Sequence, residues 1–471
     1  WGRRVGGGRP SAGRAARAGG RGGWARLAGP VEPRLWPIPV VVILAAVGVG
    51  LALPRIDLLV DGALPLGVDS FVFNGGADTA RSVLSSIAGS LITATSLTFS
   101  LTVVALQLAS SQASPRVLRM FARDRHVHWT LATFLGTFAF AITVLRTIRS
   151  EGESAAEFVP RVSVTLAFVL TLVSMVMLVL FLAHLAAQLR VETILKEIHA
   201  ETDDVIDRES ERHSAAVAFA GAIIVPPHRH VVTADQSGFV TSRDRLALVE
   251  AGTKHGIVIQ EARHIGENVV AGTPLAYWWS SVEAAAPDRE AVEALEESVR
   301  CAHVVGYERT SSEDVDFGIQ QILDIALRAL SPGVNDPTTA VHALGHLSAI
   351  TVRTAAMSSM PPGLADGAGA LRVVTSPVTS ADRIRAALSP MRHHGAASPA
   401  VVDRLLQTVD ELAYVTGEPG VRDELGRQLA ALEEQLQVLG DDPATTRESL
   451  RRLETVRDRL RGDGDSAGFG T

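Results

Sequence analysis

The sequence predicts a membrane α-helical protein with about four transmembrane helices and a cytoplasmic α+β region, in which a small all-β module precedes a helical domain. Three observations support this fold class. The long apolar runs of the 471-residue chain lie before Arg190, and most of the acids lie after it. Residues 222–279 hold short apolar runs broken by Pro, Gly and Asp. Helical spacing of apolar residues returns from Asp288 onward.

The composition excludes some classes of protein. The single cysteine, Cys301, rules out an internal disulfide framework and a metal cage built from several cysteines. Lysine occurs only at Lys196 and Lys254, so nearly all basic residues are arginine. This bias is typical of a GC-rich bacterial genome and says little about mechanism.

Residues 1–33 form an Arg/Gly-rich leader that we expect to be disordered. Residues 1–30 carry seven arginines, many glycines and no acid, and such a composition buries too little apolar surface to fold. Two interpretations stay open: a basic arm held against anionic lipid head groups, or a disordered segment without a role of its own.

Residues 34–190 form the predicted transmembrane domain. A helix needs roughly 20 apolar residues to cross a bilayer. Four runs come close to that length or exceed it: residues 36–53, 84–110, 129–145 and 162–189. The fourth run is the strongest of them. Pro54 and Arg55 follow the first run, and we expect them to end its helix.

The positions of the arginines predict the orientation. Arg116, Arg119, Arg123 and Arg125 lie between the second and third spans, whereas the other two loops carry several acids. By the positive-inside rule both termini are cytoplasmic, and the protein lies in the bacterial inner membrane. These four arginines are also candidate contacts for lipid head groups or anions. The alternative is that they only anchor the topology and pair with acids.

The second span carries a polar stripe. Ser86, Thr93, Ser100 and Gln107 are each seven residues apart, and Ser96 falls on a neighbouring position of the same helical face. Such a stripe can line a hydrated pore or cavity, because hydroxyl groups in hydrocarbon prefer water or a polar partner. It can equally serve close helix packing. Both interpretations stay open, and they coexist in an oligomer.

His184 is the ionisable residue inside the fourth span. Ionisable residues within a membrane are functional candidates by default, so we consider a role in gating or proton transfer. The alternative is that His184 lies at the level of the head groups, because it is near the cytoplasmic end of the span.

Two sequence blocks resemble a known family. The first is FSLTVVALQLASSQASPRVLRMFARDR, residues 99–125, followed by FLGTFAFAITVLR. The second is LDIALRALSPGVNDPTTAVHAL, residues 323–344. Together they resemble the uncharacterised bacterial membrane-protein family called domain of unknown function 2254, over residues from Trp36 to about 440. The resemblance implies the membrane topology and supplies no chemistry.

The soluble part begins with a predicted helical stalk, residues 191–221, followed by the small β module, residues 222–280. GFV followed by IGENVVAGTPLAYW resembles the glycine-punctuated hairpins of a barrel-sandwich hybrid. Carrier domains of that kind are modified on a lysine in the central hairpin, and no lysine is present there. The resemblance therefore implies a structural β-collar.

The predicted helical domain covers residues 281–461, and residues 462–471 form a flexible tail. Asn335, Asp336 and Thr338 are a candidate ligand motif, since they precede a helix start where backbone N–H groups attract anions. The alternative is that Asp336 only caps this helix, with Pro337 at its first position. His342 and His346 have the spacing of two ligands to one metal ion, but no metal motif surrounds them, and we predict no metal site.

No nucleophile with a base, phosphate-binding loop or paired-carboxylate pattern stands out, so we expect no enzymatic activity and no cofactor. The expected partners are membrane lipids and other copies of this chain, with an ion or small ligand of unknown identity and no nucleic acid. Two functions stay open. One is an oligomeric channel or pore-like transporter with a cytoplasmic regulatory domain. The other is a membrane-anchored sensor or scaffold, whose cytoplasmic domain binds a ligand or a protein.

Overall fold

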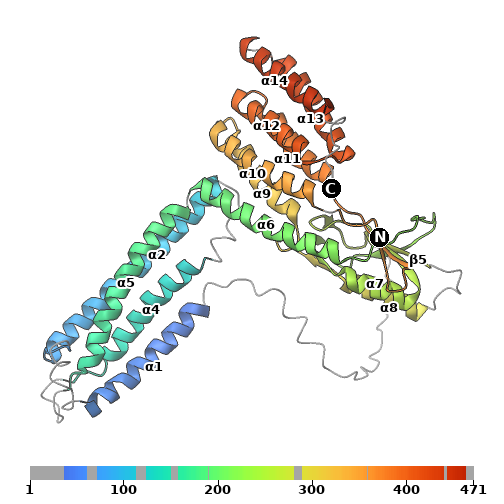
Figure 1. Cartoon of the computed structure of the whole chain (residues 1–471). Helices are drawn as coiled ribbons and strands as arrows, with labels where there is room; N and C mark the ends of the chain where they lie inside the picture. The colour runs from blue at the N-terminus through green and yellow to red at the C-terminus, as the bar shows by residue number, and fades with distance from the viewer. Residues whose placement is uncertain are drawn as a thin grey trace, which may run out of the picture. The chain divides into compact units, whose positions relative to one another are not determined.

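The computed structural model describes residues 37–60, 72–112, 124–149, 158–188, 190–280, 289–357, 359–439 and 443–462. The chain divides into two compact units. Unit 1 is Trp1–Ser96 with Met120–Leu178, and unit 2 is Leu97–Arg119 with Val179–Thr471. Figure 1 shows the long helices α1, α2, α4 and α5, and the mixed helical and β part that follows them in the chain.

Among the described residues, four helices are long and apolar enough to cross a membrane, and they lie at the four predicted spans. They are α1 (Pro37–Val60), α2 (Ala77–Gln112), α4 (Arg125–Leu145) and α5 (Arg161–Gln188). The first helix is longer than predicted, because it continues through Pro54 instead of ending there. A membrane helix tolerates an internal proline, which removes a single backbone hydrogen bond while neighbouring helices support the segment.

The core of unit 1 is built from aromatic and aliphatic side chains of α2, α4 and α5, including Phe134, Phe140 and Leu84. Helix α1 packs closely against α4. A Cβ atom on Gly136 would lie 2.7 Å from Val42, so glycine allows this close approach of the two backbones. The third predicted span is therefore the most enclosed of the four, with 56% of its span buried.

Asp57 connects α1 to the start of α5. Its carboxylate accepts hydrogen bonds from the backbone N–H of Val162 at 3.3 Å and of Ser163 at 3.1 Å. The hydroxyl of Ser163 donates to the same carboxylate at 2.7 Å. The first N–H groups of a helix have no partner within it, so Asp57 caps α5 from another helix.

Unit 2 contains α6 (Val191–Ala215) and a group of helices that packs on it. These are α9 (Val315–Ala329), α10 (Pro337–Ala356), α11 (Ser380–Gly395), α12 (Pro399–Val415), α13 (Pro419–Leu439) and α14 (Pro443–Gly462). Helix α6 contacts α9 and α10, α10 contacts α12, and α11 contacts α13. Figure 1 shows these helices stacked in chain order.

Two β-sheets complete unit 2. The five-stranded sheet has the order β1-β5-β3-β8-β7, and the three-stranded sheet has the order β4-β2-β6. All neighbouring strands are antiparallel except β3 and β8, which are parallel. The strands are β1 (His230–Thr233), β2 (Gly238–Arg243), β3 (Ile257–Glu261), β4 (Asn268–Val269), β5 (Pro274–Ser280), β6 (His303–Gly306), β7 (Gly363–Ala365) and β8 (Leu371–Val374).

The prediction that residues 222–280 are all β is wrong, because the run LALVEA belongs to helix α7 (Arg245–His255). Asp244 caps this helix by accepting a hydrogen bond from the N–H of Ala247 at 3.0 Å, and Gly256 ends it in the left-handed conformation at φ 65°. Leu248 is fully buried in a core with Trp278 and with Leu295 of α8 (Arg289–Cys301). These caps and this core favour helix over strand.

The sheets also use strands from later in the sequence. Strand β6 comes from residues 303–306, and β7 and β8 come from residues 363–374, all within the segment predicted to be a helical domain. Helix α6 ends at Ala215. Extended residues follow it, and the N–H of Phe219 donates to the carbonyl of Gly363 at 2.9 Å. The β structure is therefore assembled from segments far apart in the chain.

Candidate functional site

The polar stripe of α2 is exposed. Its five members are Ser86, Thr93, Ser96, Ser100 and Gln107, and each has an exposed side chain. The buried residues of α2 lie on another face of the helix, in the core of unit 1. Hydroxyl groups are thus presented outward within a helix that is long and apolar enough to cross a membrane.

Some hydroxyl groups of α2 are satisfied by their own helix. The hydroxyl of Thr93 donates to the carbonyl of Gly89 at 2.9 Å, and that of Thr102 donates to the carbonyl of Thr98 at 2.8 Å. This bonding lowers the cost of a hydroxyl in hydrocarbon. A Cβ atom on Gly89 would meet no atom within 4 Å, so the space beside this exposed glycine is open to another helix.

The candidate lipid or anion contacts are largely untested by the structure. Arg116, Arg119 and Arg123 lie outside the described residues. Arg125 is the first residue of α4 and is exposed, next to the capping residue Asp124. His184 is half-buried on α5. Roles for these residues in anion binding, gating or proton transfer remain predictions.

The motif around Asp336 forms the expected helix cap. The carboxylate of Asp336 accepts from the N–H of Thr339 at 3.1 Å and from its hydroxyl at 2.6 Å. These hydrogen bonds lower the pKa of Asp336 below its ordinary value. Asn335 adopts a positive φ of 48°, which asparagine tolerates better than most residues. The predicted ligand role of Asn335, Asp336 and Thr338 remains a prediction.

His346 lies close to a histidine that the sequence spacing did not suggest. Its Nδ1 atom is 2.6 Å from Nδ1 of His199 on α6. The centroid of its ring is 4.9 Å from that of His199 and 5.2 Å from that of His342. Among the described residues, no group of three or more His, Cys, Asp or Glu side chains is arranged to hold a metal ion. Partial burial and the neighbouring His199 lower the pKa of His346 to about 4.

A buried ion cluster, which the sequence did not reveal, lies where β2 and β3 meet α7. Glu261 at the end of β3 is fully buried and receives two guanidinium groups. Nη1 of Arg243 lies 2.6 Å from one carboxylate oxygen of Glu261, and Nε of Arg245 lies 2.8 Å from the other. Two positive charges therefore share one negative charge. We call Arg243, Glu261 and Arg245 the arginine triad.

The positive charges of the arginine triad dominate the pKa values around it. Although burial opposes ionisation of Glu261, the two guanidinium groups lower the pKa of this carboxyl to about 2. Burial lowers the pKa of Arg243, and the charge of Arg245 acts in the same direction. Burial and the charge of Arg243 lower the pKa of His303 to about 4. Its Nδ1 atom is 2.8 Å from the carbonyl oxygen of Val299.

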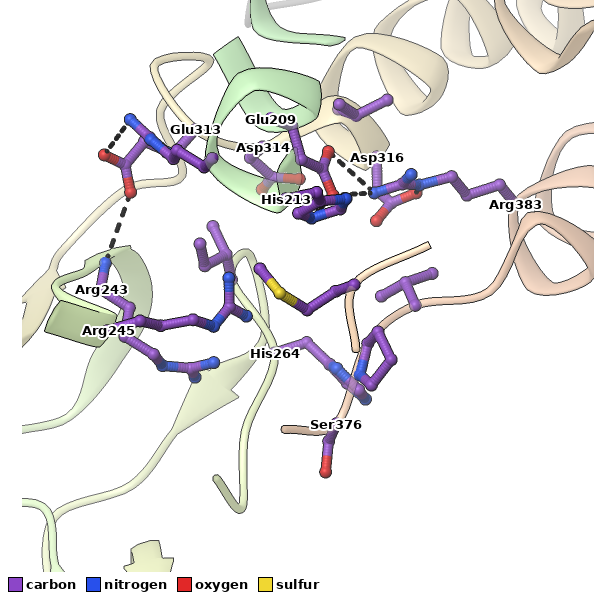
Figure 2. A pocket seen from close by; sticks show the side chains of 16 residues that line it. Glu209, His213, Arg243, Arg245, His264, Glu313, Asp314, Asp316, Ser376 and Arg383 are labelled. Atoms are coloured by element: carbon purple, nitrogen blue, oxygen red, sulfur yellow. Dashed lines mark hydrogen bonds and ion pairs between the residues drawn. The ribbon is translucent and has the colours of Figure 1, made fainter. Parts of the chain in front are cut away.

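A cavity of about 60 Å³ lies beside the arginine triad. Figure 2 shows Arg243 and Arg245 on one side of this cavity and Arg383 on the opposite side. Arg383, which is buried, pairs with Glu209 of α6 at 3.0 Å and with Asp316 of α9 at 3.2 Å. The cavity thus has a side rich in arginine and a side rich in carboxylates.

Asp314, which lines this cavity, belongs to a second pair of charges. Asp314 caps α9 through the N–H of Phe317 at 2.9 Å and pairs with Arg309 at 2.8 Å. Burial raises the pKa of Asp314 to about 6, against the opposing charge of Arg309. Gly266, at φ 84°, approaches this pair so closely that a Cβ atom would lie 2.2 Å from the Asp314 carboxylate. This close approach explains why glycine occupies position 266 of the predicted glycine-punctuated hairpin.

A larger groove of about 820 Å³ adjoins the cavity. The two share Arg212, Arg243, Arg245, Ile265, Glu313 and Met360 in their linings. The groove runs between the end of α6, the start of α7 and strand β7, all within unit 2. Its volume is within the range of about 300 to 1,000 Å³ that is typical of small-ligand sites.

A sequence signal for this site did exist. Arg243 and Arg245 are two residues apart at the junction of a strand and a helix, and Glu261 is the charged residue in the largely apolar run GIVIQEA. A charge in a buried strand demands a partner of opposite sign. The sequence does not say which partner, because the strands that bring these residues together are separated in the chain.

The fold defines a class: a helical membrane protein in which four candidate membrane helices are joined to a large unit of mixed helices and sheets. Residues 32–411 match the model of a family described as predicted membrane protein, DUF2254. The chain belongs to this family, which confirms the resemblance found in its two sequence blocks. The family's description specifies no activity.

The chain is similar to curated proteins of two mycobacteria. It is 31% identical over 410 residues to an uncharacterized protein of Mycobacterium tuberculosis strain H37Rv and to one of Mycobacterium bovis. Each alignment covers 85% of this chain and 75% of the relative. No solved structure matches the chain. The comparisons thus support the membrane class.

Proposed function

We propose that the protein is an oligomeric channel or pore-like transporter of the bacterial inner membrane, with both termini in the cytoplasm. The observation that carries the proposal is the exposed polar stripe of α2, formed by Ser86, Thr93, Ser96, Ser100 and Gln107. In this proposal α2 lines the conducting path, and the part of unit 2 that follows α5 is a cytoplasmic regulatory domain. The cargo is an ion or a small solute.

The physical argument concerns what surrounds the stripe. Polar groups that face hydrocarbon cost free energy, so such a face is expected to contact water or another polar surface. Within one chain the stripe of α2 is exposed. A ring of copies would satisfy it, because each α2 would contact its neighbour at small residues such as Gly89 and turn its hydroxyl groups toward a central path.

The proposal gives the protein a defined set of partners. These are membrane lipids and further copies of this chain, without nucleic acid, cofactor or catalytic step. The arginine-rich loop fits the cytoplasmic side by the positive-inside rule. Residues Arg116, Arg119, Arg123 and Arg125 would then attract anions or lipid head groups at the mouth of the path.

The test is ion flux through liposomes that contain the purified full chain. We expect Ser96→Phe to reduce the flux at least tenfold, because the added ring blocks a path lined by this face. Leu97→Phe is the matched control, since Leu97 is the next residue along α2 and 56% exposed. We expect this control to keep the flux within twofold of the wild type.

Two results would contradict the channel. One is the absence of flux above empty liposomes for a panel of small cations and anions. The other is a monomeric chain in detergent and in nanodiscs, measured by light scattering, because a single copy leaves the stripe without neighbours. Equal loss of flux in Ser96→Phe and Leu97→Phe would contradict the proposal that the polar stripe lines the path.

A membrane-anchored sensor or scaffold is the second candidate, and the contacts of α6 favour it. Helix α6 begins at Val191, directly after α5 ends at Gln188. Its acids pair with two later helices: Asp203 with Arg353 of α10 at 2.8 Å, and Glu209 with Arg383 of α11 at 3.0 Å. A change in the soluble helices would therefore reach α6 through ion pairs.

The sensor is tested by complementation of a strain that lacks the gene. A chain that ends at Arg190 keeps the predicted spans and lacks α6 with everything after it. We expect it to reach the membrane without restoring the wild-type phenotype. Full complementation by this truncated chain would exclude the sensor, because no soluble unit would remain to bind a signal.

A further inference from the structure

The groove beside the arginine triad has an apolar floor. Leu246 and Val249 of α7, Met360, and Leu364 and Ala365 of β7 line it. Leu246 is 75% exposed, although a leucine side chain stabilises a fold most when it is buried. A groove of about 820 Å³ with such a floor has the size and apolar character of a site for a small organic molecule.

Two guanidinium groups that share one carboxylate lie beside the groove. Arg243 and Arg245 share the single carboxylate of Glu261, so the arginine triad carries a formal charge of one positive unit. The side chain of Arg243 is 1% exposed, and its Nε atom has no hydrogen-bond partner among the described residues. The side chain of Arg245 is 23% exposed. Both line the groove, and Arg245 is the one that a solute can reach.

Arg245 also has unused hydrogen-bond donors. A guanidinium group has five N–H donors. The described contacts of Arg245 use Nε, at 2.8 Å from Glu261, and Nη2, at 3.3 Å from the same carboxylate. The remaining donors of Arg245 can therefore bind an anionic group without breaking the arginine triad.

Most of the acids that line the groove are already engaged. Glu313 pairs with Arg212 at 2.8 Å, and Asp366 pairs with Arg372 at 2.6 Å. Asp244 caps α7, where the helix dipole is positive. Glu250 follows Leu246 by one turn of α7, and Lys254 follows Glu250 by another, so their opposite charges offset each other at the groove. Asp244 keeps its negative charge there, so the formal charges around the groove cancel, and the positive group that a solute can contact is the partly exposed guanidinium of Arg245.

We propose that this groove binds a small organic anion, in which one carboxylate or phosphate monoester is attached to an apolar body. The anionic group contacts Arg245, and the apolar body covers Leu246, Val249 and Met360. The inference goes beyond the proposed channel or sensor, because it names a ligand class and does not depend on what the membrane helices conduct.

The test is equilibrium dialysis of the full chain in nanodiscs, with empty nanodiscs as the blank. The probes are 1-naphthoate, 1-naphthyl phosphate and the neutral 1-naphthamide. We expect both anions to bind at one site per chain and at least fivefold more tightly than the amide. The ratio between the two anions distinguishes a carboxylate ligand from a phosphate ligand.

Variants then locate the site. Arg245→Gln leaves Arg243 and Glu261 as an equal pair, and we expect it to weaken both anions at least fivefold while the amide is unchanged. Arg245→Lys keeps the charge and should recover part of the loss. Val249→Trp fills the floor and should abolish binding of all three probes. Arg289→Gln is the control, because Arg289 is 93% exposed on α8, where it pairs with Glu293.

Three results would overturn the inference. The first is binding of no probe above the blank. The second is equal affinity for the amide and the anions. The third is unchanged anion binding in Arg245→Gln when its thermal unfolding shows that it is folded. Since flux and oligomeric state do not enter this experiment, its failure leaves the channel proposal standing, and the reverse also holds.

Discussion

The Nδ1 atoms of His199 on α6 and His346 on α10 lie 2.6 Å apart, which joins two helices through a pair of imidazole rings. At this distance one nitrogen donates a hydrogen bond and the other accepts it, so at least one ring must be neutral at Nδ1. Nε2 of His199 lies 3.5 Å from Asp203, which in turn pairs with Arg353 at 2.8 Å. Protonation of both rings would place two positive charges in contact.

We expect the stability of the protein to fall as the pH drops from about 6.5 to about 4, because of His346. Its pKa is lowered from 6.5 to about 4 in the folded chain. Between these values the unfolded chain binds more protons than the folded one, so acid favours unfolding. His346→Gln removes this titration. Both proteins should lose Tm between pH 7 and pH 4.5, and the loss in His346→Gln should be smaller than that in the wild type by about 2 to 4 °C. This difference is modest because His346 is partly exposed and solvent screens its charge.

The measurement is thermal unfolding of the detergent-solubilised full chain, followed by tryptophan fluorescence at a series of pH values. His394→Gln is the control, since His394 is exposed on α11. It should reproduce the wild-type dependence. Identical curves for the wild type and His346→Gln would mean that the contact between the two rings does not control protonation.

We expect Gly266→Ala to destabilise the protein by about 2 to 4 kcal/mol, from backbone strain plus a steric clash. The new Cβ would lie 2.2 Å from the carboxylate of Asp314 and 2.6 Å from Nη2 of Arg309, at φ 84°. Gly272→Ala is the matched control, because Gly272 has φ 80° and open space around its Cβ position. It should lose only about 1 kcal/mol, the cost of the left-handed conformation. Equal losses of Tm in the two variants would show that Arg309 and Asp314 can move away from the new Cβ without loss of stability.

We expect Glu261→Gln to be the most destabilising single charge change in the sheet, by about 3 to 5 kcal/mol, because it leaves the buried guanidinium of Arg243 without its carboxylate. Glu261 has its pKa lowered to about 2, so this contribution is present above pH 4.5 and is lost as the pH falls through 2. Glu267→Gln should cost less than about 1 kcal/mol. Glu267 is 35% exposed and pairs with Arg263 at 2.5 Å. Chemical unfolding of the two variants measures both values, and a loss from Glu261→Gln no larger than that control would contradict the role of the arginine triad.

We expect Asp57→Ala to destabilise unit 1 by about 1 to 2 kcal/mol, since the N–H groups of Val162 and Ser163 lose their acceptor. Asp57 is 7% exposed, and its carboxylate holds the start of α5. Asp78→Ala is the control, because the side chain of Asp78 is 96% exposed in the first turn of α2. It should change stability by less than about 0.5 kcal/mol. The measurement is the Tm of both variants in the same detergent. Similar Tm values would contradict the role of Asp57 as a cap of α5.

The membrane helices could be predicted from the sequence because their signal is local. A run of about 20 apolar residues must be helical in a bilayer, whatever the rest of the chain does. The cap at Asp336 is local as well, since the carboxylate bonds to the N–H of Thr339 only three residues away. The α2 stripe followed from helical periodicity, and its exposure in the structure agrees with one continuous face.

The β structure and its site could not be predicted in the same way. The run LALVEA is short, and both strand and helix fit it until Asp244, Gly256 and the buried Leu248 are placed. Strand β3 pairs in parallel with β8, whose residues come more than one hundred positions later. No local pattern records such a partner.

The sequence by itself determined the four candidate membrane helices and the polar stripe of α2, because each depends on residues close together in the chain. Only the tertiary structure decided that Arg243 and Arg245 share Glu261 beside a groove, and that His199 contacts His346 across 147 positions. The physical reason is that burial and pairing of charges depend on which distant segments pack together, and that choice depends on the free energy of the whole fold.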